Sequence, residues 1–376
     1  MHFRPDKPFN QLPDLPPKAD LETPRVLRAT TRAGRALAEL KGRTHTIPNP
    51  TILLNTLALQ EAKLSSEIEN IFTTNDELYR GLAANGNGAE LSPHAKEVLH
   101  YREALWHGMN VLRDRPFLST NLTIEIVNII NQNSAGIRNF PGTTLQNPQT
   151  KEIIYTPPAG EDLLRQKLAN LERFSNDSSH DLDPLVRIAV THYQFEAIHP
   201  FFDGNGRTGR ILIILQLIVN RLLEIPVLFL SRFIIERKAQ YYHGLRSVTE
   251  NGEWESWLLY MLEAMEATAH GTTQKINAIH DLLFETLEKA KRILPKRTFS
   301  KELVELTFEQ PYCKIRFVEE AGIAKRLTAT KYLRDLAKAG FVTPVKKGRE
   351  LIFINHPLWS LLTDEPLPKS GATTKR

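Results

Sequence analysis

The hydrophobic residues of the chain show their clearest pattern on either side of a short polar stretch near its middle. Residues 183–198 begin with an Asp-Pro pair, which suits a helix N-cap and first position, and then repeat apolar residues at helical spacing. Residues 211–219 are apolar apart from Gln216, which is typical of a helix buried on all sides. The pattern therefore predicts two core helices joined by a loop at residues 199–210.

The predicted loop has the residue types of an anion-binding site. It reads His-Pro-Phe-Phe-Asp-Gly-Asn-Gly-Arg-Thr-Gly-Arg from residue 199 to residue 210. Gly204, Asn205 and Gly206 adopt positive φ at low cost, and such turns direct backbone N–H groups at one point beside the positive end of the following helix. Arg207 and Arg210 are three residues apart and share one face of that helix, so both can reach the same anion.

Two common nucleotide-binding motifs match this stretch only in part. The glycines at 204, 206 and 209 have the spacing of the dinucleotide fingerprint, but that fingerprint follows an apolar strand, whereas a helix precedes it here. Residues 204–209 also have the spacing of a Walker A motif, but Arg210-Ile211 stands where Lys and Ser or Thr are required. Both interpretations are rejected.

The same residues resemble the HPFxxGNGRxxR signature of Fic domains, proteins that transfer the AMP part of ATP to hydroxyl side chains. Every fixed position of the signature is matched. The resemblance implies these roles: His199 as general base, Asp203 as the Mg²⁺ ligand, Gly204, Asn205 and Gly206 as the anion hole, Arg207 on the inner phosphates, Arg210 on the γ-phosphate, and Phe201 as the anchor of the loop. Thr208 and Gly209 complete the predicted nucleotide-binding stretch.

General chemistry supports these roles independently. Imidazole has an ordinary pKa of about 6.5, so His199 can accept a proton at working pH, a role worth roughly 10²–10⁴ in rate. A carboxylate such as Asp203 suits Mg²⁺, which proteins bind through one or two carboxylates together with substrate phosphates. Some Fic relatives that phosphorylate have a bulkier residue at the position of Gly206, so the glycine favours AMP transfer.

A second informative stretch is the helix predicted from residue 50 to about residue 72, which follows an Asn-Pro start and carries leucines at near-helical spacing. Near its end, Ser65, Glu69 and Asn70 resemble the (S/T)xxxE(G/N) inhibitory motif of Fic proteins. The resemblance implies that Glu69 borders the nucleotide site and pairs with Arg210, because a carboxylate can mimic a phosphate to a guanidinium. On pattern alone, Ser66 and Glu69 also fit a capping box.

Two further segments are expected near the nucleotide. Residues 137–158 change from helical to β-rich composition around turn residues, which predicts a hairpin. It resembles the Fic flap, which pairs with the target protein by main chain, and would place Ile154 and Tyr155 beside the nucleotide, although a surface hairpin with packing side chains is the alternative. Of two adjacent tyrosines in a later helix, Tyr242 is favoured to border the adenine.

Composition limits the protein class without identifying it. The chain has 376 residues, a net charge of +5 and one cysteine, Cys313, which excludes a disulfide framework and a cysteine-rich zinc site. Residues 1–20 are polar and proline-rich, without an apolar signal region, and the most apolar window, residues 211–230, is interrupted by polar residues. A cytoplasmic protein without a membrane span is expected.

The C-terminal region is expected to be a separate module. Three short helices and two strands around a basic turn at residues 346–349 resemble a winged helix-turn-helix, which binds DNA in some proteins and mediates dimerisation or docking in others. Its basic residues suit DNA, but acidic residues dilute the charge. The expected domains are an N-terminal helical region at 1–110, a Fic core with the flap and a linking helix at 111–294, a winged helix at 295–362 and a disordered tail at 363–376.

The sequence thus predicts a mainly α-helical Fic protein that uses Mg²⁺ and ATP to attach AMP to Tyr, Thr or Ser of proteins, including itself, and is restrained by Glu69. Removal of AMP, with Glu69 positioning water, stays open, as does a homodimer. The main alternative is a DNA-binding transcriptional regulator that uses the Fic domain as a nucleotide sensor. A third candidate is transfer from another diphosphate donor.

Overall fold

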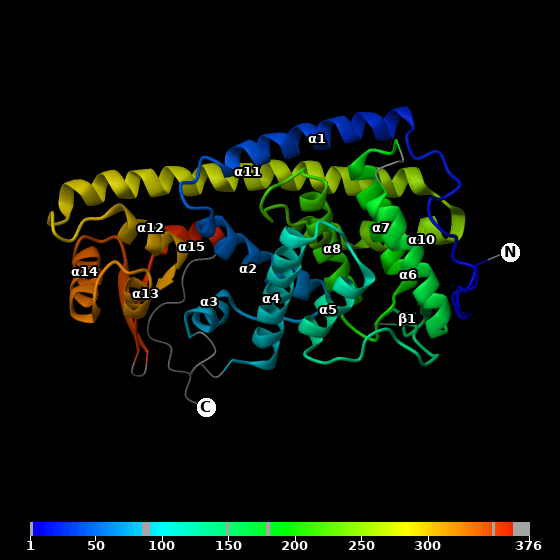
Figure 1. Cartoon of the computed structure of the whole chain (residues 1–376), viewed down its shortest axis with the longest axis horizontal. Coiled ribbons are helices and arrows are strands. Elements are labelled where there is room, and N and C mark those ends of the chain that lie inside the picture. Colours follow the sequence, from blue (N-terminus) through cyan, green and yellow to red (C-terminus); the bar gives the residue numbers. More distant parts are fainter. Residues whose placement is uncertain (1–2, 85–90, 148–149, 178–180, 348–349, 364–376) are drawn as a thin grey trace. The chain divides into compact units, whose positions relative to one another are not determined.

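The computed structural model describes residues 3–84, 91–147, 150–177, 181–347 and 350–363. These residues form a mainly α-helical protein with one two-stranded and one three-stranded antiparallel sheet (Figure 1). The predicted mainly α-helical fold with a small β-hairpin is confirmed.

The chain divides into two compact units, and both draw on several segments. Unit 1 contains residues 1–41, 64–71 and 97–270. Unit 2 contains residues 42–63, 72–96 and 271–376. The N-terminal region that the sequence predicts at residues 1–110 therefore contributes to both units.

Helices assigned in part to each unit are α1 (Pro24–Thr44), α2 (Pro50–Ile68), α4 (Pro93–Asp114) and α11 (Trp254–Ile293). Helices of unit 1 alone are α5 (Thr120–Asn131), α6 (Glu161–Asn176), α7 (Pro184–Ile198), α8 (Asn205–Val219), α9 (Ser231–Glu236) and α10 (Lys238–Asn251). Its hairpin consists of β1 (Leu145–Gln146) and β2 (Ile153–Tyr155). Within this unit α6, α7 and α8 lie side by side (Figure 1).

Of the two helices at the centre of unit 1, α7 begins and ends where the sequence predicts, whereas α8 begins at Asn205, inside the predicted loop. The side chain of Asp183 caps α7 by accepting a hydrogen bond of 2.8 Å from the backbone N–H of Leu185, and Pro184 follows as the first helical residue. His199 ends α7 in the left-handed region, with φ 48°. Gly204, also left-handed with φ 79°, precedes α8, whose residues are almost all buried. A loop between two core helices is therefore present, but it ends at Gly204 and residues 205–210 belong to α8.

The N-terminal residues lie against the end of the hairpin, a contact that the sequence does not predict. The backbone N–H of Phe9 donates to the carbonyl of Thr156 at 2.9 Å, and the Thr156 hydroxyl donates to the carbonyl of Pro5 at 2.6 Å. The rings of Phe3 and Phe9 contact the ring of Tyr155, with centroid separations of 5.5 Å to 6.4 Å within this cluster. The base of the hairpin is thereby fixed to the N-terminal segment.

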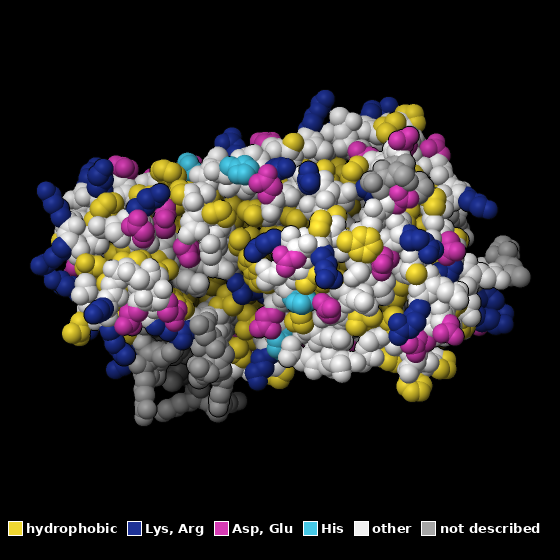
Figure 2. Space-filling model, in the orientation of Figure 1, with side chains coloured by type: hydrophobic (Ala, Val, Ile, Leu, Met, Phe, Trp, Pro, Cys, Tyr) yellow, Lys and Arg dark blue, Asp and Glu magenta, His cyan; other side chains and the backbone are white. Residues whose placement is uncertain are grey.

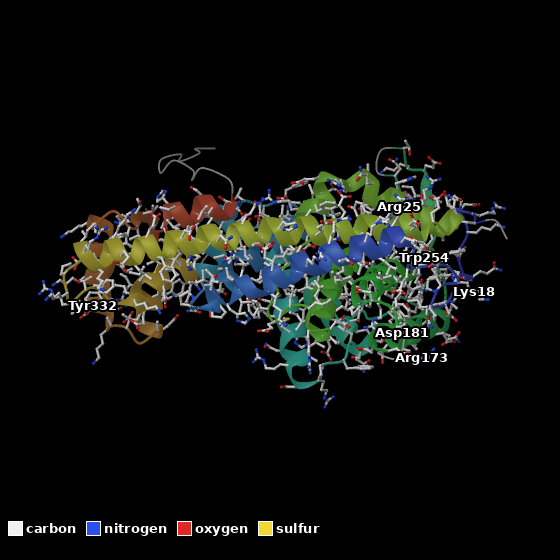
Figure 3. All side chains as sticks on the ribbon, turned by 90° about the horizontal axis from the view of Figure 1, so that it is seen from above. Lys18, Arg25, Arg173, Asp181, Trp254 and Tyr332 are labelled. Carbon is white, nitrogen blue, oxygen red and sulfur yellow. The ribbon has the colours of Figure 1, made fainter. Side chains whose placement is uncertain are left out.

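The arginines of α1 lie on an exposed face of the helix. Arg25 pairs with Glu255 at 2.7 Å, and Arg32 pairs with Glu266 at 3.0 Å, both on the part of α11 that belongs to unit 1. Figure 3 shows Arg25 and Trp254 on these two neighbouring helices. The sequence predicts separate helices starting near Trp254 and Thr273, whereas α11 is one helix of 40 residues.

Unit 2 contains the C-terminal elements. Its own helices are α3 (Asn75–Ala84), α12 (Lys301–Glu309), α13 (Ile315–Glu320), α14 (Arg326–Lys338) and α15 (His356–Thr363). Its sheet has the order β3 (Tyr312–Cys313), β5 (Glu350–Ile354) and β4 (Thr343–Lys347). Three helices and a hairpin occur as predicted, whereas β3 and α15 were not foreseen. A cluster of Tyr79, Tyr312 and Trp359 packs in its core.

Two boundaries in this unit differ from the sequence prediction. The expected strand Phe341-Val342 begins only at Thr343, because the N–H of Phe341 donates to the carbonyl of Leu336 and closes the end of α14 around the left-handed Gly340. Thr363, where a disordered tail was expected to begin, is the last residue of α15. The rest of that tail lies outside the described residues, and so does part of the basic turn at 348–349.

None of the helices in the described ranges combines the length and the apolar character needed to cross a membrane.

Candidate active site

The loop between α7 and α8 is held in a single shape by its own side chains. Asn205 spans it twice, because its Oδ1 accepts from the N–H of Phe201 at 2.9 Å and its Nδ2 donates to the carbonyl of Phe201 at 2.8 Å. Phe201 is almost completely buried, as predicted for the anchor. Asn131 of α5 donates to the carbonyl of Asp203 at 2.9 Å. These bonds fix the turn that presents the N-terminus of α8.

Arg207 lies at that N-terminus and is surrounded by carboxylates. Its side chain is only 1% exposed, and each guanidinium nitrogen has an acidic partner. Nε donates to Oε2 of Glu69 at 3.0 Å, Nη1 donates to Oε1 of Glu97, and Nη2 donates to Oδ2 of Asp203 at 3.2 Å. A buried guanidinium is stable only when its donors have acceptors, so an incoming anion must replace at least one of these carboxylates.

Arg210 forms the second half of the cationic site. Its Nη2 donates to Oε1 of Glu69 at 2.8 Å, which confirms the predicted ion pair. Ser65 supplies two more acceptors, its hydroxyl to Nε at 2.7 Å and its carbonyl to Nη2 at 2.8 Å. Burial, the largest single influence, would lower the pKa of Arg210, but Glu69 together with Tyr101, Tyr241 and Glu196 outweighs it and raises this pKa above its ordinary value. Glu69 thus bridges both arginines, one oxygen to each.

Glu69 reaches the arginines because α2 ends beside them. Asn70 is left-handed with φ 64°, its N–H donates to the carbonyl of Glu67, and the N–H of Ile71 donates to the carbonyl of Ser66. This is a Schellman cap, which explains why Gly or Asn suits the last position of the motif. Gly206 leaves room for the carboxylate, because a Cβ there would lie 2.6 Å from Oε1 of Glu69.

His199 immediately precedes this cationic site. Burial, reinforced by the positive charge of Arg138, lowers the pKa of His199 to about 4, although the carbonyl of Glu196 and the charge of Asp203 oppose the shift. The imidazole is therefore neutral at physiological pH and can accept a proton. Its Nδ1 atom is buried, which leaves Nε2 as the nitrogen that a substrate can meet.

Glu196, one turn before His199 on α7, is a titratable group that the sequence does not single out. Burial raises the pKa of Glu196 to about 7, with Arg210 opposing the shift and Glu69 adding to it. The carboxyl lies against Gly209, where a Cβ would come within 2.4 Å of Oε1. Gly209 is therefore required for the close approach of α7 and α8.

Three family models match consecutive parts of the chain. Residues 27–110 match the Fic/DOC family N-terminal model, and residues 117–217 match the Fic/DOC family model. Residues 282–358 match the model of the protein adenylyltransferase SoFic-like C-terminal domain. Residues 27–110 and 117–217 are therefore similar to the Fic/DOC family.

Named Fic relatives are similar over part of their length. Protein adenylyltransferase fic-1 of Caenorhabditis briggsae is 35% identical over 114 residues, which is 30% of this chain and 21% of that protein. Protein adenylyltransferase Fic of Nematostella vectensis is 27% identical over 199 residues, which is 49% of this chain and 44% of that protein. The chain thus spans between about a fifth and less than half of the relatives it matches.

Solved Fic structures share the fold. A Fic family protein from Desulfovibrio desulfuricans G20 superposes with a TM-score of 0.56 at 15% identity, covering 89% of this chain and 96% of that chain. Fic-1 from Caenorhabditis elegans superposes with a TM-score of 0.52 at 22% identity, covering 68% and 74%. At these identities the likeness is one of fold.

The structure brings most of the predicted Fic residues together. Asp203 carries an exposed carboxylate at the loop, with 72% of its side-chain area accessible. Among the described residues no group of three or more His, Cys, Asp or Glu could hold a metal ion. A single exposed carboxylate such as Asp203 is the kind of ligand that Mg²⁺ uses together with substrate phosphates and water.

The other residues predicted to border the nucleotide differ in how exposed their side chains are. Thr208 is completely buried in α8, so its side chain does not reach the surface of the site. Tyr155 is also buried, and its hydroxyl donates to the carbonyl of Ala197 at 2.7 Å, which makes it a support of the flap base. Ile154 is 36% exposed. Tyr242 is about half exposed, whereas its neighbour Tyr241 is buried and forms a hydrogen bond with His192. Partial burial raises the pKa of Tyr242, and the charge of Arg210 opposes that shift. Ile154 and Tyr242 thus stay predictions for the nucleotide pocket.

Three supporting residues were missed. Arg138 is buried, and its Nε donates to the carbonyl of His199 at 2.8 Å while its backbone N–H donates to the carbonyl of Pro200. Lys238 donates to the carbonyl of Ile68 at 2.7 Å and so holds the end of α2. Glu97 binds Arg207 from α4. Each is a single polar residue far away in sequence, so no local pattern identifies it.

Proposed function

We propose that this Fic protein is a protein adenylyltransferase that transfers AMP from Mg-ATP to hydroxyl side chains of proteins, itself included, and that Glu69 restrains it. The observation that carries the proposal is the carboxylate of Glu69, which bridges two buried arginines beside a neutral histidine. A site that binds a carboxylate with two guanidinium groups is also suited to a polyphosphate.

In the proposed reaction His199 acts on the target side chain. Its neutral Nε2 takes the proton of a Ser, Thr or Tyr hydroxyl as that oxygen attacks the α-phosphorus of ATP. The new oxygen–phosphorus bond forms while the bond from the α-phosphorus to the bridging oxygen breaks, and pyrophosphate leaves. AMP stays on the target through a phosphodiester, and the proton stays on His199 until solvent removes it.

Arg207 and Arg210 hold the phosphates during this step. Arg207, at the start of α8, reaches the inner phosphates, and Arg210, one turn later, reaches the γ-phosphate. The backbone N–H groups at the start of α8 add partial positive charge at the same point. Because these donors are fixed before the substrate arrives, they stabilise the charge that develops on the phosphates without reorganising.

Asp203 is the protein ligand that would hold Mg²⁺. The bound cation would neutralise charge on the phosphates of ATP. The carboxylate of Asp203 lies on the exposed side of the loop. It can therefore turn from Arg207 toward a cation without disturbing the buried anchor Phe201.

The proposed restraint arises because Glu69 accepts hydrogen bonds from the same arginine nitrogens that a phosphate would use. While Glu69 occupies Nε of Arg207 and Nη2 of Arg210, neither nitrogen is available for a phosphate. ATP must therefore displace Glu69 or bind in a position that does not react. The same carboxylate could orient a water molecule that hydrolyses the bond between AMP and the target, which would restore the hydroxyl and release AMP.

A pair of isotope labels tests the chemistry of transfer. Glu69→Gly is incubated with Mg²⁺ and ATP labelled at either the α- or the γ-phosphate, and Glu69→Gly/His199→Ala serves as the control. The proposal predicts protein labelled from the α-phosphate only, and none in the control. Labelling from the γ-phosphate would show phosphoryl transfer instead. Unlabelled GTP, UTP or CDP-choline competing better than ATP would show a different donor.

A further inference from the structure

Arg207 has one carboxylate partner to which the proposed reaction gives no task. Glu97, near the start of α4, accepts from Nη1 of Arg207. Its side chain is 30% exposed, whereas Arg207 is 1% exposed, so the carboxylate reaches from a partly open position onto a buried guanidinium. Both residues belong to unit 1.

The other two partners of Arg207 must leave it when the substrate binds. Glu69 has to give up Nε because the phosphates need the cationic site. Asp203, which accepts from Nη2 at 3.2 Å, is the residue proposed to hold the cation. Glu97 then remains as the one protein carboxylate on Arg207 among those that the described structure shows there.

Glu97 binds a nitrogen of Arg207 that lies outside the edge a phosphate would use, so both can be bound at once. A guanidinium offers two parallel donors along one side, formed by Nε and one Nη, and this edge binds carboxylates and phosphates bidentately. Glu69 and Asp203 take Nε and Nη2, which form that side edge, whereas Glu97 takes Nη1 at the other end. A phosphate can therefore replace the first two without competing with Glu97.

We infer that Glu97 is a positioning residue that holds the guanidinium of Arg207 with its Nε–Nη2 edge turned toward the phosphates of ATP. The inference rests on the proposed function and adds a second acidic residue with a role opposite to that of Glu69. Glu69 competes with the substrate for the arginines, whereas Glu97 stays paired throughout and assists binding. Without it, Arg207 can rotate about its side-chain bonds and loses a charge-assisted hydrogen bond.

The test separates phosphate recognition from general damage to the fold. Dissociation constants for ATP and for adenosine are measured by calorimetry in the Glu69→Gly background, with and without Glu97→Gln. Glutamine has the same shape as glutamate, so the site keeps its packing. The matched control is Glu103→Gln, which removes the same charge from an exposed position on the same helix.

We expect Glu97→Gln to raise the dissociation constant for ATP about ten- to a hundredfold, as expected for one lost charge-assisted hydrogen bond. The dissociation constant for adenosine should stay unchanged. Glu103→Gln changes neither. Unchanged or tighter ATP binding would overturn the inference, and tighter binding would make Glu97 a second competitor. Equal weakening of ATP and adenosine would also overturn it.

Two further outcomes keep the result decisive. If Glu97→Gln does not fold, Glu97→Asp is tested in the same way, because it keeps the charge with a shorter reach and should show a smaller loss that is still selective for ATP. If ATP binding weakens selectively but no variant transfers AMP, the assignment of Glu97 is supported while the proposed transferase activity fails.

Discussion

Basic side chains gather in two regions of this molecule, and the fold treats them in opposite ways. In unit 1, Arg207 and Arg210 are at most 4% exposed, and glutamates and a serine surround them. In unit 2, α14 and the residue before it carry basic residues that are all exposed: Lys325, Arg326, Lys331, Arg334 and Lys338. Figure 2 shows Lys and Arg side chains with Asp and Glu between them over this region.

The two regions differ in how closely their geometry defines a possible ligand. Where buried guanidinium groups are paired with carboxylates, the geometry of these partners describes the anion that can replace them. An exposed lysine or arginine is satisfied by water, so its presence is compatible with DNA, with a protein or with solvent alone. The buried pair therefore supports a specific function, whereas the basic face of α14 does not.

The largest expected effect is on the free energy of unfolding, when one arginine is removed from each region. Arg207→Ala leaves Glu97 without its cation and leaves Glu69 paired with Arg210 alone, and it should destabilise the protein by roughly 2–4 kcal/mol, below the value for a fully buried pair because both carboxylates are partly exposed. Arg334→Ala on α14 should change stability by less than about 0.5 kcal/mol. Urea unfolding of both variants measures the difference, and similar losses would break the contrast.

The next effect concerns pH, because buried charge also changes how His199 titrates. Burial and Arg138 lower its pKa to about 4, so the imidazole stays neutral, and able to accept a proton, as pH falls through 6.5. The kcat/KM of Glu69→Gly should therefore hold from pH 8 to 5.5, whereas a histidine of ordinary pKa would lose about tenfold.

Glu196 is the control in that experiment, because its pKa of about 7 lies in the same range and Arg210 and Glu69 both act on it. The profile is therefore repeated in Glu69→Gly/Glu196→Gln. A fall with a midpoint near 6.5 in both variants would contradict the assigned state of His199.

A smaller effect is expected at the end of α2. Lys238→Met removes the hydrogen bond to the carbonyl of Ile68 and should loosen the helix end that carries Glu69. Loss of about 0.5–1.5 kcal/mol at this contact corresponds to roughly a two- to tenfold rise in self-labelling of the otherwise unchanged protein. In the Glu69→Gly background the same substitution should have no effect. A rise in both backgrounds would show that Lys238 acts elsewhere.

The smallest effect is expected on α14. Lys331→Ala/Arg334→Ala should change neither AMP transfer nor, at physiological salt, the fluorescence anisotropy of a labelled mixed-sequence DNA duplex. Saturable DNA binding that the double variant abolishes would instead support the transcriptional regulator. That binding should also weaken as salt rises, because phosphate contacts release counterions.

The comparison also shows which parts of the structure the sequence could predict. Local signals were reliable: the Asp183 cap, the end of α7 at His199 and the turn at Gly204 are all properties of neighbouring residues. The helix predicted to about residue 72 ends at Ile68, because Asn70 adopts the left-handed cap that its own motif suggests.

Long-range partners could not be predicted in the same way. Glu97, Arg138 and Lys238 contact the site from distant segments, and none belongs to a periodic pattern or a turn. Strand β3 was missed because two residues cannot show an alternation. The sequence therefore predicts the anion site, while the geometry that holds it depends on tertiary contacts.

The measurement that tests the central claim most directly is the initial rate of self-labelling from α-labelled ATP in the unchanged protein, in Glu69→Gln and in Glu67→Gln. Glu67 lies two residues earlier on α2, so its substitution removes the same charge from the same helix. If Glu69 occupies the phosphate site of the two arginines, Glu69→Gln labels at least about tenfold faster and Glu67→Gln labels like the unchanged protein. Equal rates in all three would contradict the account.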